Sequence, residues 1–103
     1  MKITICGSLR FELEIQAWHE ILALAGHTVY CMVLLPSEKG GIKDWYSAKQ
    51  KTTLDLLHLS KIEESDAIFV VDIGGYIGES TAREIEWAEI RGKGVYYIRN
   101  SSK

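Results

Sequence analysis

The sequence is poor in proline, in cysteine and in long apolar runs, and each shortage argues against a class of protein. With one proline, 25% charged and 47% hydrophobic residues, its composition is globular, unlike that of a disordered chain, a collagen or a coiled coil. The longest apolar run, Val29–Leu35, has seven residues, whereas a membrane-spanning helix needs about 20. The chain reaches Gly7 too soon to hold a signal-peptide core. We therefore expect no membrane partner and no secretion signal.

An excess of charge of one sign is also lacking. Twelve Lys and Arg stand against 14 Asp and Glu, giving a formal net charge of −2. A nucleic-acid-binding surface would be basic and patterned, so no nucleic-acid partner is expected. Cys6 and Cys31 lie in apolar, strand-like segments, which favours buried free thiols in a reducing cytosol over a disulfide framework. A chain of 103 residues has room for one core, so we expect a single cytoplasmic domain over residues 1–103.

Apolar periodicity predicts four strands and three helices in strict alternation. The strands are expected at Lys2–Cys6, Thr28–Leu35, Asp66–Asp72 and Gly94–Ile98, and the helices from Phe11 to Ala25, from about Trp45 to Ser65 and from Ser80 to Arg91. Leu54, Leu57 and Ile62 are expected on the inner side of the second helix. This alternation predicts an α/β, Rossmann-like or flavodoxin-like domain. Its parallel sheet should have the strand order 2-1-3-4, with helices on both faces.

The predicted topology also indicates where a ligand would bind. In such sheets ligands bind beyond the carboxyl ends of the strands, where the strand order reverses. Here that point lies between the first and third strands. We therefore expect the loop after Cys6 and the loop after Asp72 to face each other across one crevice.

The first of these loops carries groups suited to an anion. Gly7 allows close approach of the backbone, Ser8 adds a hydroxyl and Arg10 a guanidinium fork, next to the N-terminus of a helix. The alternative is a plain turn in which Ser8 caps the helix and Arg10 lies in water. The loop lacks the G-x-G-x-x-G spacing of dinucleotide-binding folds, and no cofactor is predicted.

The second loop contains three glycines within five residues, more than a turn requires. Such a loop can wrap closely around a ligand, and an aromatic ring within it can stack on a base. The candidate ligand-binding residues here are Gly75, Tyr76, Gly78, Ser80 and Thr81.

Glu84 follows this loop and has two interpretations. Thr81-x-x-Glu84 has the spacing of a capping box, which needs no substrate. Alternatively, the helix dipole keeps Glu84 ionised at the mouth of the crevice, where a carboxylate can attack a sugar C1 carbon as its bond to a base breaks.

His58 lies on or beside the inner face of the second helix, one turn after Leu54 and one turn before Ile62. A lone histidine is more often structural, bonded to a backbone carbonyl, than catalytic. His19, His27 and His58 have no metal-ligand spacing, and the cysteines form no C-x-x-C motif, so no metal is predicted.

Together these segments resemble the nucleoside 2-deoxyribosyltransferase superfamily, especially its small 2′-deoxynucleoside 5′-monophosphate N-glycosidase branch. Ile5–Arg10 looks like the C-G-S-I-R loop of that branch, which contacts the 5′-phosphate and sugar. The segment from His58 to Asp72 looks like the family's D-L-x-x-I-x-x-S/A-D helix and following apolar strand. The segments Glu84–Ala88 and Gly92–Val95 are similar to its E-L/I-G-x-A and G-K-P-V/I segments.

The resemblance implies that Glu84 is the catalytic nucleophile. The family's acidic residue on the second helix, which helps to protonate the leaving base, falls on His58, and its first-loop tyrosine is absent near Ser8 and Leu9. The loop Gly74–Gly78 is also similar to the P-G-G-x-G-T loop of lysine-decarboxylase-like phosphoribohydrolases. These enzymes likewise cleave N-glycosidic bonds.

The sequence therefore predicts an enzyme that cleaves the N-glycosidic bond of a nucleoside or nucleotide, by deoxyribosyl transfer or hydrolysis. Asp72 or His58 would position the sugar or assist departure of the base. The alternatives are a nucleotide-binding module that senses its ligand without turnover, and a purely structural domain. The family builds its sites across dimer contacts, so we expect a homodimer or larger, with Trp45 or Trp87 as candidate anchors at the second or third helix.

Overall fold

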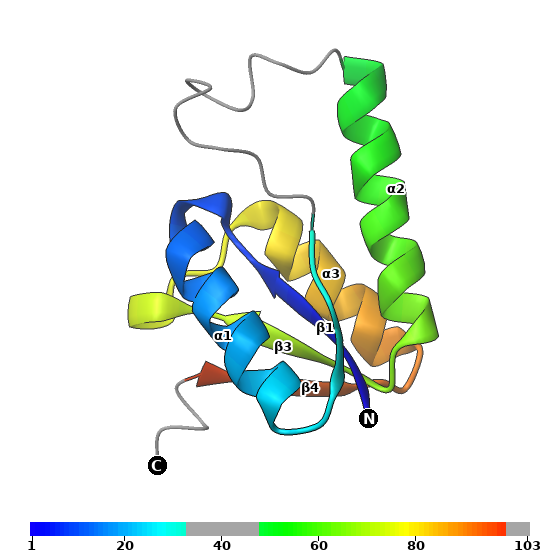
Figure 1. Ribbon diagram of the computed structural model, residues 1–103. Coiled ribbons are helices and arrows are strands. Elements are labelled where there is room, and N and C mark those ends of the chain that lie inside the picture. Colours follow the sequence, from blue (N-terminus) through cyan, green and yellow to red (C-terminus); the bar gives the residue numbers. More distant parts are fainter. Residues whose placement is uncertain (33–47, 99–103) are drawn as a thin grey trace.

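A computed structural model of the chain describes residues 1–32 and 48–98, and these form a four-stranded parallel sheet with helices on both faces (Figure 1). The strands are β1 (Lys2–Gly7), β2 (Thr28–Tyr30), β3 (Ala67–Val71) and β4 (Gly94–Tyr97), and the helices are α1 (Glu12–Leu24), α2 (Ala48–Glu64) and α3 (Glu79–Ile90). The strand order is β2-β1-β3-β4, and all neighbours are parallel. The predicted fold class and strand order are confirmed.

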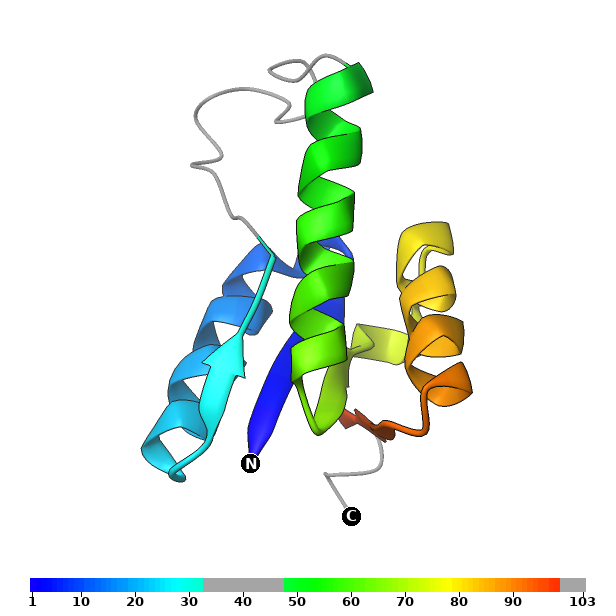
Figure 2. The same cartoon turned by 90° about the vertical axis from the view of Figure 1, so that its right-hand side faces the viewer.

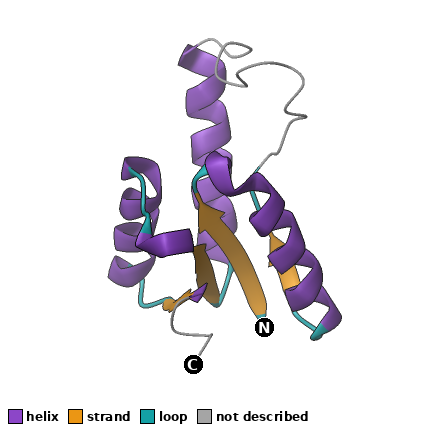
Figure 3. Cartoon of the chain, turned by 90° about the vertical axis from the view of Figure 1, so that its left-hand side faces the viewer, coloured by secondary structure: helices purple, strands orange, loops and turns teal. Residues whose placement is uncertain are grey.

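The sheet is covered on both faces because its central strands alternate two sets of side chains. Ile3 and Ile5 of β1 pack with Ile15 of α1, together with Phe69 and Val71 of β3. The intervening residues face α2 and α3, where Cys6, Ile62, Ile68, Val70 and Ala88 form a second cluster. Figures 2 and 3 show the resulting arrangement, with α1 on one side of the sheet and α2 and α3 on the other.

β2 is shorter than predicted. It pairs with β1 only over Thr28–Tyr30 and leaves the ladder at Cys31, whose carbonyl oxygen accepts a hydrogen bond from Lys61 Nζ at 2.9 Å. The remainder of the predicted strand, residues 33–35, lies outside the described residues, as does the start predicted for the second helix at Trp45.

The inner position predicted for Leu57 is wrong, and of the two interpretations of Glu84 the capping box does not hold. Leu57 is 50% exposed, because the buried stripe of α2 runs through His58 and Ile62 at a spacing of four, and Leu57 lies about 100° around the axis from it. The capping box is absent: α3 begins at Glu79 after Gly78, so Thr81 is the third helical residue and its side chain is buried. Glu84 accordingly lies in the second turn, not the first.

A glycine, Gly26, follows the end of α1, close to the helix end predicted at Ala25. It follows α1 with a φ of +98°, in the left-handed region that favours glycine. The chain then turns directly into β2, which brings Thr28 N within 3.0 Å of the Met1 carbonyl oxygen at the start of β1.

Candidate functional site

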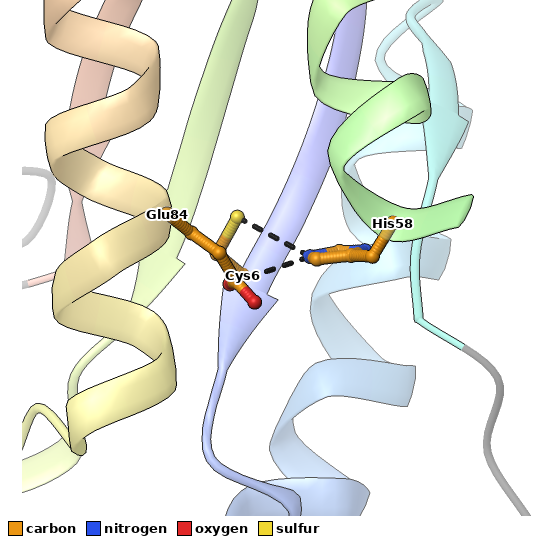
Figure 4. Close-up of side chains that lie close together, drawn as sticks. All are labelled: Cys6, His58 and Glu84. Carbon is orange, nitrogen blue, oxygen red and sulfur yellow. Dashed lines mark hydrogen bonds and ion pairs between the residues drawn. The ribbon is translucent and has the colours of Figure 1, made fainter. Parts of the chain in front are cut away.

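Three polar side chains from three different elements meet beside the carboxyl end of β1 (Figure 4). Cys6 comes from β1, His58 from α2 and Glu84 from α3. His58 Nε2 lies 3.4 Å from Glu84 Oε1 and 3.6 Å from Cys6 Sγ. We call this group the Cys-His-Glu cluster.

The cluster is nearly shielded from water. Cys6 is fully buried, His58 is 5% exposed, and the Glu84 side chain is 18% exposed. Burial raises the pKa of the Cys6 thiol well above its usual value, and the charge of Glu84 and a hydrogen bond to it raise that pKa further. The Cys6 thiol is therefore protonated at neutral pH and is no nucleophile.

The contacts of the His58 imidazole nitrogen Nε2 are with two side chains. Its Nε2 atom faces Glu84 and Cys6, and its buried Nδ1 atom has no hydrogen-bond partner within the described part of the chain. The expected backbone carbonyl is thus not its partner there. An imidazole nitrogen beside a carboxylate and a thiol is chemically suited to proton transfer or, when that nitrogen is unprotonated, to ligation of a cation.

Glu84 also borders a pocket of about 320 Å³ between α2 and α3, a volume at the lower end of those typical of small-molecule sites. Both helices contribute side chains: the lining residues are Asp55, Leu59, Ser80, Arg83, Glu84, Glu86, Trp87 and Ile90. Of the residues predicted from sequence, Ser80 and Glu84 therefore meet here. Glu84 belongs to both the pocket and the Cys-His-Glu cluster.

The two predicted loops meet, as the topology required. Arg10, after β1, stacks its guanidinium carbon 3.9 Å from the centroid of the Tyr76 ring, and Phe11 packs edge-on against the same ring at 5.9 Å. Ser8 Oγ accepts a hydrogen bond from Arg10 N at 3.3 Å, so Ser8 also serves as the cap of the turn. Arg10 and Tyr76 remain partly open to solvent.

The other residues predicted from the sequence lie outside both the Cys-His-Glu cluster and the pocket lining. A Cβ on Gly7 would lie 3.1 Å from the Val71 carbonyl oxygen, so the approach of β3 explains this glycine without a ligand. Gly75 has a φ of +82°, whereas Gly78 is the extended residue before α3. Asp72 and Thr81 are buried and belong neither to the Cys-His-Glu cluster nor to the pocket lining.

Cys6 is a site residue that the sequence interpretation missed, and so are the pocket-lining residues other than Ser80 and Glu84. Residues 6, 58 and 84 have no spacing that indicates a site, because the fold alone brings β1, α2 and α3 together. The signal available was the alternation in β1, which directs Cys6 to the side covered by the second and third helices.

Comparison of the chain with protein-family models, with curated proteins and with solved structures gave no match. Within residues 1–32 and 48–98, no helix has the length and apolar character needed to cross a membrane.

Proposed function

We propose that this protein cleaves the N-glycosidic bond of a nucleoside or nucleotide, with Glu84 as nucleophile. The observation that carries the proposal is the position of Glu84 at the border of the pocket, with its Oε1 atom 3.4 Å from His58 Nε2. A carboxylate in that position can reach a ligand in the pocket while the His58 imidazole lies beside it.

The reaction has two steps. The Glu84 carboxylate attacks C1′ of the sugar, the bond between C1′ and the base nitrogen breaks, and its electron pair leaves with the base, which takes up a proton. Water or the nitrogen of a second base then attacks C1′, the bond between C1′ and the Glu84 carboxylate breaks, and the proton lost by the attacking group returns to the group that protonated the leaving base. Hydrolysis and deoxyribosyl transfer differ only in this acceptor. In this proposal His58 supplies the proton or stabilises the ionised carboxylate.

The loops after β1 and β3 would hold the rest of the substrate. Arg10 and Ser8 are the groups suited to a 5′-phosphate, and Tyr76 offers an aromatic face to a base or to the sugar. Engagement of a phosphate requires Arg10 to leave the Tyr76 ring, a rearrangement of one exposed side chain.

The test is incubation of chelator-treated protein with a panel of nucleosides and 2′-deoxynucleoside monophosphates, with chromatographic detection of free base. Glu84→Gln should lower turnover by orders of magnitude, because an amide carries no charge to meet the developing oxocarbenium ion. Glu89→Gln is the matched control, since Glu89 is exposed on the same helix and lies outside the pocket lining.

Near-parental turnover in Glu84→Gln would remove Glu84 from the mechanism. Saturable binding of a nucleotide without release of base would reject catalysis and support the sensing module instead.

A further inference from the structure

The Cys-His-Glu cluster presents three different ligand atoms to one point. Cys6 Sγ, His58 Nε2 and a Glu84 carboxylate oxygen all lie within 4.8 Å of one another, and Figure 4 shows the three side chains converging from β1, α2 and α3. Each belongs to a different regular element, so the backbone holds the donor atoms in place without the help of a loop.

Two of the three separations agree with those around a tetrahedral zinc ion, and the third, from Cys6 Sγ to the Glu84 oxygen, is at most 4.8 Å. Typical Zn–S, Zn–N and Zn–O bond lengths imply edges of about 3.5 Å between sulfur and nitrogen and about 3.4 Å between nitrogen and oxygen. The observed distances are 3.6 Å and 3.4 Å. We propose that Cys6, His58 and Glu84 form a binding site for a thiophilic divalent cation of the zinc class, with a fourth position left for water or a ligand.

The donor set selects this class of cation. A thiolate and an imidazole favour Zn²⁺ and Co²⁺ over Mg²⁺ and Ca²⁺, which prefer oxygen ligands throughout. The charges also balance, because a thiolate and a carboxylate together neutralise one divalent cation in a site shielded from water. The cation enters from the pocket side, where Glu84 forms the border between the pocket and the cluster.

The cation site goes beyond the proposed function and does not depend on it. A cation held by Glu84 would occupy the carboxylate that the glycosidic reaction needs. Zinc would therefore act as a reversible inhibitor of base release, relieved by a chelator.

Titration of the chelator-treated full chain with Co²⁺ tests the site directly. We expect saturation at one equivalent, with a thiolate-to-cobalt charge-transfer band and the intense visible absorption of tetrahedral cobalt, and displacement of both by Zn²⁺. Cys6→Ser should abolish the charge-transfer band and weaken binding by more than the about 10- to 100-fold that loss of an outer-shell group costs. Cys31→Ser, at a half-buried thiol outside the cluster, is the matched control and should bind like the parent.

Absence of the band in the parent, or its persistence in Cys6→Ser, would overturn the proposal. Because Cys6 is buried, circular dichroism checks the fold of that variant. If the Cys6→Ser protein does not fold, the site is tested with His58→Ala and Glu84→Gln. Each of these substitutions should weaken cobalt binding at least about tenfold. Cobalt affinity equal to that of the parent in both variants would reject the site.

The two proposals fail separately. Cobalt binding without release of base from any substrate would keep the cation site and reject the glycosidase. Release of base by a protein that binds neither Co²⁺ nor Zn²⁺ would keep the glycosidase and reject the cation site.

Discussion

At the scale of single residues, the Cys6 thiol is protonated in the metal-free protein and, in the proposed cation complex, ionised. In the metal-free protein, burial and the neighbouring Glu84 charge keep its thiol protonated. A bound cation would reverse that balance, because the ligand is the thiolate and the positive charge of the ion stabilises it. Glu84 therefore adds to the effect of burial in suppressing ionisation of Cys6 and is also its proposed partner in ligation.

A pH dependence of stability follows for the metal-free protein. The pKa of Cys6 is higher in the folded state than in the unfolded state, so its contribution is fully present below about pH 8.5, the usual value for an unfolded thiol, and is lost as pH rises through the folded-state pKa. Urea unfolding midpoints should therefore fall in alkaline solution.

Glu84→Gln is the informative comparison for this effect. It removes the charge that helps to raise the pKa of Cys6 in the folded state but leaves the burial, so the alkaline loss of stability should end at lower pH and be smaller than in the parent. Identical pH profiles for the two proteins would contradict the coupling between Glu84 and Cys6.

At the scale of elements, the contact between β1 and the end of α2 is fixed by a buried hydrogen bond. The hydroxyls of Thr4 and Ser65 lie 2.6 Å apart, and Ser65 also donates to the Lys61 carbonyl oxygen at 2.8 Å. Both residues are almost fully buried. This contact sets the carboxyl end of α2 against the sheet, and His58 lies two turns earlier on the same helix.

Removal of the two hydroxyls should be non-additive. Ser65→Ala leaves the Thr4 hydroxyl buried without this partner and should cost about 1–3 kcal/mol in the free energy of unfolding. Thr4→Val should cost less, because Ser65 keeps its bond to Lys61. Adding Thr4→Val to Ser65→Ala should then recover part of the loss, which chemical denaturation of the four proteins measures. If the losses in unfolding free energy of the two single variants simply add in the double variant, the interaction between Thr4 and Ser65 contributes nothing to stability.

At the scale of the whole molecule, the helices that flank the pocket leave apolar side chains on the surface. Leu56 and Leu57 of α2 are 59% and 50% exposed, and Ile90 of α3 is 74% exposed. Trp87, one of the two predicted anchors, lies under the Arg91 guanidinium, whose carbon is 3.3 Å from the ring centroid. Trp45, the other, lies outside the described residues.

The homodimer therefore stays a prediction, now centred on α2 and α3. Leu57→Asp should shift the protein toward monomer in light scattering at tens of micromolar, an order of magnitude at which weak dimers appear. Leu13→Asp is the matched control, because Leu13 is 75% exposed on α1, across the sheet. A parent protein that is monomeric at this concentration, or equal effects of both substitutions, would contradict an interface on α2 and α3.

The sequence by itself determined the order of elements and the two faces of the sheet, because those depend on local periodicity. The apolar stretch Ala67–Val71 and the stop at Gly26 are properties of short segments, and parallel βαβ connections leave little choice of topology. It also indicated that the loops after β1 and β3 would meet.

Only the tertiary structure decided the length of the edge strand β2 and which polar groups share a site. It also decided that Gly7 packs against β3 and that the side chain of Thr81, a residue of α3, is buried. Lys61 binds the Cys31 carbonyl oxygen just past β2 from 30 residues away, and β3 approaches Gly7 through the pairing of whole strands. Cys6, His58 and Glu84 meet only because three elements converge. Periodicity tells which face of an element is buried, but the side chain opposite each residue depends on how the elements pack in three dimensions.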